Sequence, residues 1–309
     1  MRILITGGCG FIGANLVRRL AARPDLRLRV FDNESLGRRE TIADVRCEFI
    51  RGDLRDREAV AAAVDGVDAV VHLAADTRVI DSISNPTHNF EVNVLGGLNL
   101  LEAMRACGVR RLINASTGGA IIGEARPPVH EEMVARPLAP YGAAKLAMEG
   151  YCTAYGGSYG IETLSLRFAN VYGPGSRHKG SVIAAFLKRV IAGQPLIVYG
   201  DGGQVRDFIY IDDLCDGIVA GLFSHACGVV QLGSGRPVSV NALIEAMRAA
   251  VAPRPIRAVY EPARAGEISA TWCDITKARL LLGFAPETPL QMGLQQTWRW
   301  FTSSAEVLA

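Results

Sequence analysis

Short apolar runs alternate with amphipathic segments along the first half of the chain. Runs that fit buried strands lie at residues 2–6, 28–31, 47–50, 67–72, 111–115 and 162–167. Apolar residues recur with helical spacing between them, at residues 11–22, 57–64, 90–106 and 140–155. Strands that are apolar throughout and separated by helices are typical of a parallel sheet covered on both faces. The pattern therefore predicts an α/β fold with a doubly wound parallel sheet.

The pattern changes after residue 169. Helices are expected at residues 182–192, 212–223, 240–251 and from 290 onward, and short strands at 196–199 and 229–232. Glycine and proline are frequent here, and the elements do not repeat one strand–helix unit. We expect a cofactor-binding domain at residues 1–169 and a smaller α/β domain at residues 170–309 that holds the substrate. Segments near residues 207–233 are expected to return to the main sheet.

The composition is that of a globular chain with little net charge. Of its 309 residues, 49% are hydrophobic, and 33 Lys and Arg are balanced by 31 Asp and Glu, for a net charge of +2. This excludes a disordered chain and a strongly basic nucleic-acid binder. Arginine outnumbers lysine 29 to 4. That excess fits anion recognition or a biased overall composition, and the scattered positions favour the second.

Cysteine usage and the N-terminus indicate the compartment. Seven cysteines are spread singly, without the Cys or His spacing of a zinc site, so we expect reduced thiols, a cytoplasmic protein and no bound metal. The N-terminal apolar run is short and ends at glycines, which fits a buried strand and not a signal peptide. No apolar stretch approaches the roughly 20 residues that span a bilayer, so no membrane partner is expected.

A glycine-rich turn follows the first predicted strand. Gly7, Gly10 and Gly13 lie between that strand and the body of the first predicted helix. The first glycine allows a tight turn, the second lets a pyrophosphate approach the backbone, and the third lets the helix pack against the strand. Because the helix N-terminus also presents free N–H groups, this arrangement predicts a Rossmann-type dinucleotide site.

Acidic residues follow the second and third predicted strands. Asp32 is placed to accept hydrogen bonds from ribose hydroxyls and to repel a 2′-phosphate, which favours NAD over NADP as the cofactor. Arg38 and Arg39 follow closely and soften that discrimination. Asp53 ends the third strand, where an acid can reach the adenine amino group.

Tyr141 and Lys145 lie four residues apart on one face of a predicted helix. A free tyrosine has a pKa near 10, which is too high for a base at neutral pH. A neighbouring ammonium and a positively charged nicotinamide ring would favour the tyrosinate. Tyr141 could then take a hydroxyl proton while hydride leaves for the cofactor. A lone Tyr-x-x-x-Lys spacing is common by chance, but it becomes specific downstream of a complete dinucleotide fingerprint.

The chain resembles the extended short-chain dehydrogenase/reductase family, and within it the sugar-nucleotide epimerases of the UDP-glucose 4-epimerase type. The motifs that carry the resemblance are TGGCGFIG at 6–13, Asp32-Asn33, Gly52-Asp53-Leu54, HLAA at 72–75, Asn93-Val94, YGAAK at 141–145, RFANVYGP at 167–174 and RDFIYIDD at 206–213. The resemblance implies NAD as cofactor. It also implies a set of cofactor contacts: Gly7, Gly10, Phe11, Ile12, Gly13, Asp32, Asn33, Asp53, Leu54, Leu73, Ala74, Ala75, Asn93, Ser116, Tyr141, Lys145 and Phe168.

The family places a Ser or Thr hydroxyl at the end of the fifth strand to bind the reacting hydroxyl. Here the segment STGGAIIG at residues 116–123 resembles the STGGAIYG variant of some UDP-glucose 4-epimerases, with Ile122 in place of tyrosine. This favours Thr117 for the hydroxyl role, with Ser116 as the alternative. Related 4,6-dehydratases follow the Thr with Asp-Glu, and related decarboxylases carry a Glu where this chain has Ala120. The glycines at 118 and 119 and the alanine at 120 disfavour both reactions.

The resemblance also implies a sugar-nucleotide site in the second half. Arg206 and Arg264 would meet the diphosphate, because guanidinium groups bind phosphate bidentately. For either arginine alone, a surface ion pair such as that of Arg206 with Asp207 is a live alternative, and for Tyr199 a core position is as plausible as stacking on uracil. Thr271 stands where some relatives carry a bulky Tyr, which leaves room for larger sugars. The implied substrate contacts are Thr117, Tyr141, Asn170, Lys179, Ser181, Val182, Tyr199, Arg206 and Arg264.

The sequence therefore predicts an NAD-dependent UDP-sugar 4-epimerase, an isomerase that acts through a transient 4-keto intermediate and most simply interconverts UDP-glucose and UDP-galactose. A UDP-glucuronate 4-epimerase shares every motif. A one-way 4-ketoreductase and a non-catalytic NAD-binding protein are weaker alternatives, the last because the Tyr–Lys pair is retained. The family also implies a homodimer, with the helices at 90–106 and 140–155 at the interface.

Overall fold

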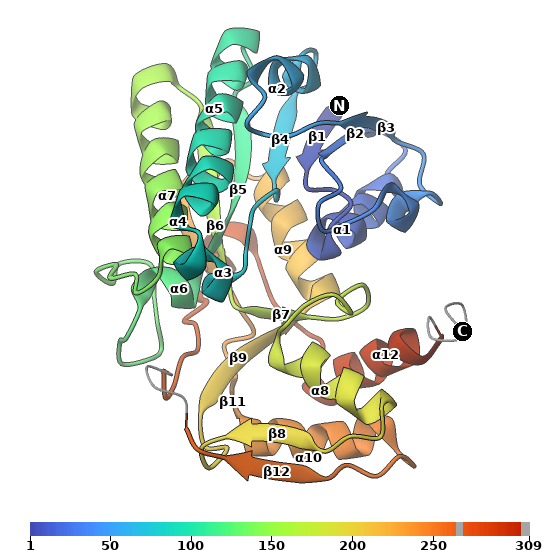
Figure 1. The fold of residues 1–309 in the computed structure, drawn as a ribbon. Helices are drawn as coiled ribbons and strands as arrows, with labels where there is room; N and C mark the ends of the chain where they lie inside the picture. Colours follow the sequence, from blue (N-terminus) through green and yellow to red (C-terminus); the bar gives the residue numbers. More distant parts are fainter. Residues whose placement is uncertain (264–267, 304–309) are drawn as a thin grey trace.

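The computed structural model describes residues 1–263 and 268–303, and a seven-stranded parallel sheet forms its centre (Figure 1). The order of the strands is β10-β6-β5-β4-β1-β2-β3, so the order reverses between β1 and β4. This confirms the predicted doubly wound sheet. The strands are β1 (Arg2–Thr6), β2 (Arg27–Asp32), β3 (Glu48–Arg51), β4 (Ala69–His72), β5 (Arg111–Thr117), β6 (Glu162–Phe168) and β10 (Gly228–Leu232).

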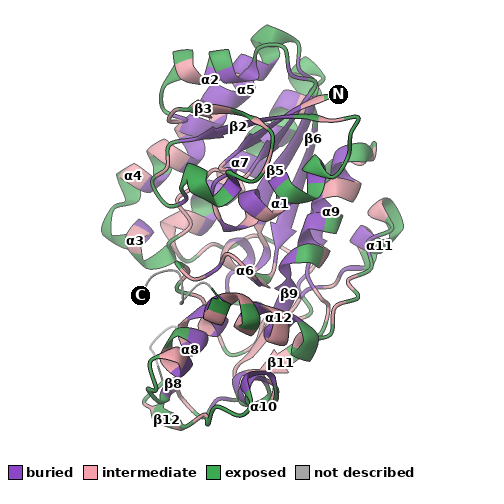
Figure 2. Ribbon diagram, turned by 90° about the vertical axis from the view of Figure 1, so that its right-hand side faces the viewer, coloured by how far each residue is buried: buried purple, intermediate pink, exposed green. Residues whose placement is uncertain are grey.

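Helices cover both faces of this sheet because its strands are apolar on both sides. On one face, α1 (Phe11–Ala21) and α9 (Ile211–Phe223) pack against strand residues such as Ile5 and Ile113. On the other, α2 (Arg57–Val64), α5 (Gly96–Cys107) and α7 (Pro140–Tyr159) pack against Leu4, Val70 and Leu112. Figure 2 shows the buried strands between helices whose outer surfaces are exposed. Of the described helices, none is long and apolar enough to cross a membrane.

The helix expected at residues 90–106 begins earlier than its apolar pattern indicates. α4 (Pro86–Phe90) starts at a proline, and the Asn85 side chain caps it by accepting a hydrogen bond from His88 N at 3.2 Å. The chain then passes through a π-helical turn (Glu91–Leu95) into α5. The sequence pattern also missed the short helices η1 (Arg39–Ile42), α3 (Val79–Ser84), α6 (Gly118–Ile122) and α11 (Thr276–Leu282).

The remaining strands form two small sheets below the main one (Figure 1). β7 (Asn170–Tyr172), β9 (Val205–Tyr210) and β11 (Pro237–Ser239) form one sheet, and β8 (Leu196–Tyr199) and β12 (Ala258–Glu261) form the other. α8 (Val182–Ile191), α10 (Val240–Val251) and α12 (Leu290–Ser303) pack around them. Of the segments near residues 207–233, β10 pairs with β6 in the main sheet, whereas β9 lies between β7 and β11.

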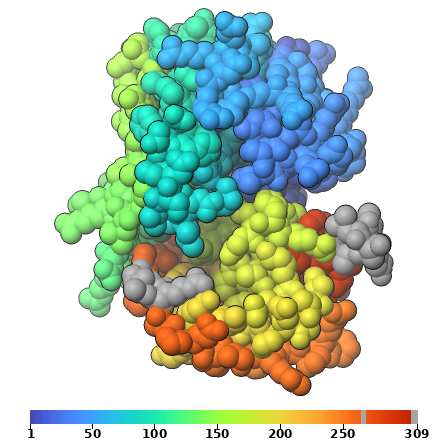
Figure 3. Space-filling model, viewed as in Figure 1, coloured from blue at the N-terminus to red at the C-terminus, as the bar shows by residue number. Residues whose placement is uncertain are grey.

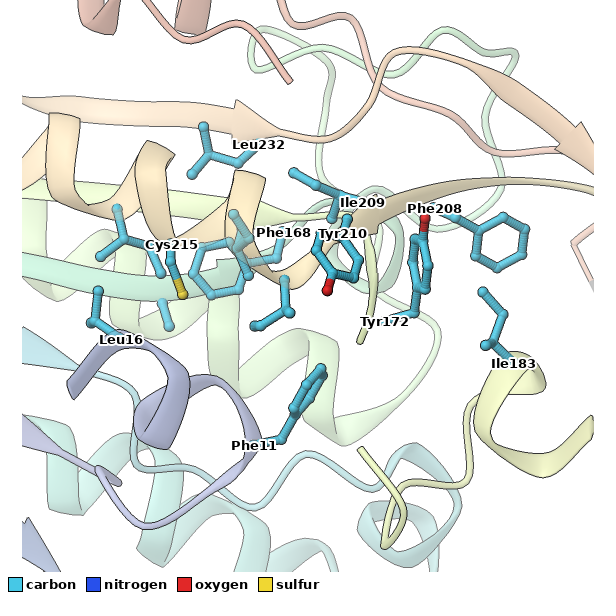
Figure 4. Packing of buried hydrophobic residues seen from close by; sticks show 14 of the residues in the cluster. Phe11, Leu16, Phe168, Tyr172, Ile183, Phe208, Ile209, Tyr210, Cys215 and Leu232 are labelled. Atoms are coloured by element: carbon cyan, nitrogen blue, oxygen red, sulfur yellow. The ribbon is translucent and has the colours of Figure 1, made fainter. Parts of the chain in front are cut away.

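One continuous apolar core joins the main sheet to the small sheets. Figure 4 shows Phe11 of α1 beside residues of β6, β7, β9 and α9. Tyr172 and Tyr210 meet there edge to face, with their ring centroids 5.6 Å apart. Asn15 Nδ2 donates to the Pro174 carbonyl oxygen at 3.0 Å, which ties α1 to the loop after β7. These contacts therefore fix the position of the small sheets relative to the carboxyl ends of the main-sheet strands.

The buried Asp207 carboxylate on β9 holds two loops at the same level. It accepts hydrogen bonds from the Ser234 backbone N and hydroxyl, from Gly235 N and from Cys273 N, at 2.7, 2.6, 3.0 and 3.2 Å. Several donors to one carboxylate make strong charge-assisted bonds. Asp207 thus anchors the loop after β10 and the segment around Cys273. Its carboxylate is buried, so it does not form the surface ion pair with Arg206 that was the alternative.

Candidate active site

The predicted glycine turn connects β1 to α1. Gly7 has a φ of +71°, and its N–H donates to the Phe31 carbonyl oxygen at 2.8 Å. A Cβ at Gly7 would lie 2.6 Å from Ala74 N, and one at Gly13 would lie 2.1 Å from the Gly7 carbonyl oxygen. At Gly10, the only close atom is that same carbonyl oxygen at 3.3 Å. Gly7 and Gly13 are therefore required by the fold itself, whereas the missing side chain of Gly10 leaves open space.

The N-terminus of α1 is free to bind an anion. Gly10 caps the helix without a side-chain hydrogen bond, and the first turn carries no acidic residue. The first N–H groups of a helix have no partner within it, and they attract phosphate. The Phe11 side chain is buried in the core and that of Ile12 is half-buried against it. Phe11 can therefore contact a cofactor only through its backbone, whereas part of the Ile12 side chain is exposed.

A cavity extends from this turn across the carboxyl ends of β2, β3 and β4 (Figure 3). It lies where the strand order reverses, which is where open α/β sheets bind their ligands. Nine of the predicted cofactor contacts line it: Gly7, Gly10, Asp32, Asn33, Asp53, Leu54, Leu73, Ala74 and Ala75. It also includes residues that the sequence motifs did not indicate: Ser35, Leu36, Gly37, Arg55, Asp76, Arg78, His88 and Val92.

The two acidic residues of this cavity are held by different partners. Asp32 accepts hydrogen bonds from Cys9 N at 2.9 Å and Glu34 N at 2.8 Å, and burial raises the pKa of its carboxyl group. The Arg55 guanidinium, bonded to Asp53, holds the pKa of that carboxyl well below its usual range. Arg39, expected to soften the preference for NAD, lies instead over the Phe49 ring at 5.1 Å. The cavity thus keeps an acid at the predicted ribose position.

A second cleft of about 440 Å³ lies below the first, between the main sheet and the small sheets. Five predicted residues line it, namely Thr117, Tyr141, Phe168, Asn170 and Arg206. Phe168, predicted as a cofactor contact, therefore belongs to this cleft. The cleft also includes Val79, Gly119, Ala120, Asp207, Ile268, Thr271, Trp272 and Cys273. Such a mixture of apolar walls and few polar groups is typical of a small-molecule site.

Tyr141 and Lys145 occupy the first two turns of α7. Tyr141 N donates to Ser82 Oγ at 3.2 Å, which fixes the start of the helix against α3. Lys145 is buried, and its Nζ donates to the Ala115 carbonyl oxygen at 2.9 Å. Burial lowers the pKa of Lys145 to about 8. Burial and the nearby Asp76 carboxylate raise the pKa of Tyr141. The pKa values of the two groups therefore move apart, because burial disfavours both the phenolate and the ammonium. A phenolate at Tyr141 would depend on positive charge nearby, from Lys145 and from the nicotinamide ring of a bound cofactor.

The two hydroxyls at the end of β5 have different surroundings. Successive residues of a strand point to opposite faces. Thr117 lines the second cleft, whereas Ser116 is buried and donates its hydroxyl proton to Glu149 Oε1 at 2.6 Å. Ser116 is therefore not available as the alternative hydroxyl, and its side chain, predicted to contact the cofactor, contacts Glu149 instead.

Several other predicted residues hold loops and do not line either cavity. Asn93 is buried; it accepts from Asp76 N at 2.9 Å and donates to the Asp76 carbonyl oxygen at 2.8 Å, so it shapes the loop after β4. Lys179 Nζ donates to Thr77 Oγ1 of the same loop at 3.3 Å, and burial lowers the pKa of Lys179. Ser181 precedes α8 and Val182 begins it, with its side chain against the core.

Tyr199, another predicted substrate contact, lies in one of the small sheets. Tyr199 ends β8, and its carbonyl oxygen accepts from Gln204 Nε2 at 2.9 Å. Arg264 lies outside the described residues.

Comparison with known proteins identifies the family. A model of the NAD dependent epimerase/dehydratase family matches residues 3–230. The chain belongs to this family. A putative UDP-glucose 4-epimerase of Methanocaldococcus jannaschii is 35% identical over 306 residues, covering 98% of this chain and 99% of that one. A UDP-glucuronate 4-epimerase of Thermodesulfobacterium geofontis is 33% identical over 322 residues, covering 99% and 97%.

Solved structures of related enzymes have the same fold over nearly the whole length of this chain. The UDP-glucose 4-epimerase of Thermus thermophilus in complex with NAD is 39% identical, with a TM-score of 0.91, and the match covers 98% of this chain and 100% of that one. The Thermotoga maritima UDP-glucose 4-epimerase with UDP-glucose is 34% identical, with a TM-score of 0.93, covering 99% and 100%. These matches confirm that the protein is an NAD-dependent isomerase of this family.

The two glycines of the turn give a direct test of the cofactor cavity. Gly10→Ala adds a methyl group beside the open cavity, where its one close contact is Gly7 O at 3.3 Å, so it should weaken NAD binding at least about tenfold while the melting temperature of the NAD-free protein falls by a few degrees. Gly13→Ala should lower that melting temperature much more, because its methyl group meets Gly7 O. Calorimetric titration with NAD and thermal unfolding check both results. Unchanged NAD affinity in Gly10→Ala would contradict the placement of the cofactor.

Proposed function

We propose that this enzyme is a UDP-sugar 4-epimerase, most simply of the UDP-glucose/UDP-galactose type. The observation that carries the proposal is that Thr117 and Tyr141 line the same cleft as Asn170 and Arg206, with buried Lys145 bonded behind them. A proton-transfer pair and polar groups suited to a diphosphate thus share one cleft. The relatives named above, which include epimerases of UDP-glucose and UDP-glucuronate, support the substrate class.

The proton transfers in this proposal belong to three residues. Bound NAD supplies a hydride acceptor and donor at the sugar carbon. Tyr141, as the phenolate, accepts the proton of the sugar 4-hydroxyl and returns it after the 4-keto group has turned over. Lys145 stabilises the phenolate, and the Thr117 hydroxyl orients the reacting oxygen. NAD would be held by the α1 N-terminus, Asp32, Asp53 and the 73–75 segment. Because each catalytic cycle would regenerate NAD, the cofactor could stay bound throughout.

The segment after Thr117 supports epimerisation over elimination. Gly118 carries no proton donor, and a Cβ there would lie 2.6 Å from Gln231 Oε1, so an acidic side chain would require Gln231 to move. Gly119 and Ala120 line the cleft and carry no proton donor. A 4,6-dehydratase or decarboxylase needs an acid at this end of β5, so oxidation and reduction at one carbon is the chemistry left to Thr117 and Tyr141.

The sugar nucleotide would extend from this pair toward the small sheets. Asn170 Nδ2 donates to the Asp207 carbonyl oxygen at 3.1 Å, which places its side chain at the cleft beside Arg206. We assign Arg206 and Asn170 to the diphosphate, together with Arg264, and Tyr199 to the uracil base. Thr271 lines the sugar end, where its small side chain leaves room for an N-acetyl or carboxyl group.

We also propose that the enzyme is a homodimer through α5 and α7. Exposed aromatic side chains support this face: Phe90, which precedes the helix through α5, is 54% exposed, and Tyr151 of α7 is 39% exposed. Tyr151→Glu should therefore give a monomer in sedimentation velocity at micromolar concentration, whereas Tyr260→Glu on β12, where the tyrosine is even more exposed, should leave the dimer intact. A parent protein that sediments as a monomer would contradict the proposal.

The function is tested by product analysis without added NADH. Incubation with UDP-glucose, UDP-N-acetylglucosamine and UDP-glucuronate, taken separately, should yield the 4-epimer of at least one of them and no net consumption of NADH. Tyr141→Phe should lower turnover by at least about 10²-fold and retain NAD, because it removes only the proton acceptor.

A second tyrosine of α7 provides the matched control. Tyr155 donates its hydroxyl proton to Glu102 away from both cavities, so Tyr155→Phe should keep full activity. If UDP-glucuronate were the only sugar nucleotide converted, it would take the place of UDP-glucose as the proposed substrate. Stoichiometric use of NADH would indicate a ketoreductase, and full activity in Tyr141→Phe would refute the mechanism.

A further inference from the structure

A buried ion pair lies behind the proposed catalytic residues and has no part in their chemistry as described so far. Glu149 of α7 and Arg167 of β6 each have 5% of their side chain exposed. Arg167 Nε bonds Glu149 Oε1 at 2.9 Å, and its Nη2 bonds Oε2 at 2.7 Å. The Ser116 hydroxyl donates to Glu149 Oε1 at 2.6 Å. One carboxylate therefore links α7 to two neighbouring strands.

The strand partners of Glu149 lie in one row across the sheet. Ser116, Arg167 and Gln231 are directly opposite one another on β5, β6 and β10. Glu131 closes the row, since its Oε1 accepts from Gln231 N at 2.7 Å and its carbonyl oxygen accepts from Arg167 Nη1 at 3.5 Å. This row crosses the sheet one residue before Thr117, at the carboxyl end where the cleft begins.

Two successive turns of α7 hold two successive residues of β5. Lys145 Nζ bonds the Ala115 carbonyl oxygen, and Glu149, one turn later, bonds the Ser116 hydroxyl. Thr117 follows on the strand, and Tyr141 precedes by one turn on the helix. The same two contacts therefore fix both the height and the rotation of Tyr141 relative to Thr117. Reacting groups misplaced by about 1 Å can cost a factor of about 10² in rate.

The charges around Lys145 give Glu149 a second effect. The groups that face the ammonium are His72 of β4, and Glu149 and Cys152 of α7. Burial lowers the pKa of His72 to about 3 and raises the pKa of Cys152 to about 12, so both are neutral at pH 7. Glu149 then supplies the negative charge that offsets part of the burial effect on Lys145. Arg167 balances Glu149 from the strand side, and Asp76 faces Tyr141.

We propose that Glu149 is a positioning residue for the reaction, which holds α7 in register on β5 and keeps Lys145 in its charged form, with Arg167 as its own counter-charge. This rests on the function proposed above. Stability alone does not explain the pair, because replacing a buried ion pair by apolar side chains of similar size is often neutral or stabilising. The double variant Glu149→Leu/Arg167→Met removes both charges without leaving one of them uncompensated.

The direct readout is the titration of Lys145. The chain has only four lysines, so a protein labelled with ¹³C at the lysine side chain gives four signals, and Lys145→Arg assigns one of them. In the NAD-loaded parent, Lys145 should titrate below the usual lysine range, because burial lowers its pKa. In the double variant the midpoint should fall further, because Glu149 is the negative charge that faces the ammonium, whereas Arg167 pairs with Glu149 from the strand side. An unchanged midpoint would overturn the electrostatic part of the proposal.

Kinetics test the positioning part. In the double variant kcat should fall at least about tenfold, with KM for the sugar nucleotide changed less than about threefold and NAD retained. The alkaline limb of the kcat–pH profile should move to lower pH, because Lys145 would lose its charge earlier as the pH rises. Glu245→Gln, which breaks the exposed pair with Arg248 on α10, is the control and should change none of these. Parent values of kcat and of the alkaline limb in a stably folded double variant would overturn the proposal.

A variant with an intact ion pair covers the case in which the double variant does not fold. Ser116→Ala removes the link from β5 to Glu149 and leaves the ion pair in place. This variant should lower kcat about threefold to tenfold with little change in KM. A kcat equal to that of the parent would overturn the proposal. The outcomes also separate the two hypotheses. Activity in Tyr141→Phe refutes the proposed function, whereas an inactive Tyr141→Phe beside fully active Glu149 and Ser116 variants refutes only the role of Glu149.

Discussion

The contact between α7 and the carboxyl end of β5 determines the geometry of the proposed active site. Lys145 reaches the backbone of the strand and buries its ammonium to do so. That burial lowers the pKa of Lys145, while burial of Tyr141 raises the pKa of the phenol. A helix that was rotated or shifted on the strand would expose Lys145 to water and would move Tyr141 away from Thr117. The packing of one helix thus sets both the positions and the protonation of the groups that would react.

The cofactor cavity depends on a second close packing, between the turn after β1 and the backbone around it. Gly7 and Gly13 permit contacts of the backbone that a Cβ would prevent, and the resulting turn aims the uncapped end of α1 into the cavity. Because the strand order reverses at this point, the segments after β2, β3 and β4 diverge and leave the space for a dinucleotide. The Asp207 carboxylate performs a comparable task for the second cleft, where it fixes the loops that form one wall.

Much of this arrangement could be predicted from the sequence, because glycine spacing, strand apolarity and the Tyr–Lys spacing act locally. The seven strands of the main sheet and the glycine turn are examples. Properties that depend on which face of a helix or strand a residue occupies were harder to predict from the sequence. Ser116 and Thr117 differ by one position and point in opposite directions, and only packing against Glu149 shows which is which. β9 was missed because its apolar run at residues 208–210 is short and leads directly into α9, and its pairing with β7 and β11 depends on the tertiary fold.

The central claim is that the sugar carbon is oxidised and reduced again by the same bound cofactor. The most direct test uses UDP-glucose with deuterium at carbon 4, incubated with the NAD-loaded enzyme in ordinary water without added NADH. The account predicts that the epimeric product keeps its deuterium at carbon 4, because the transferred hydride never exchanges with solvent. Loss of the deuterium to water would show that the carbon is deprotonated instead, and would contradict the account.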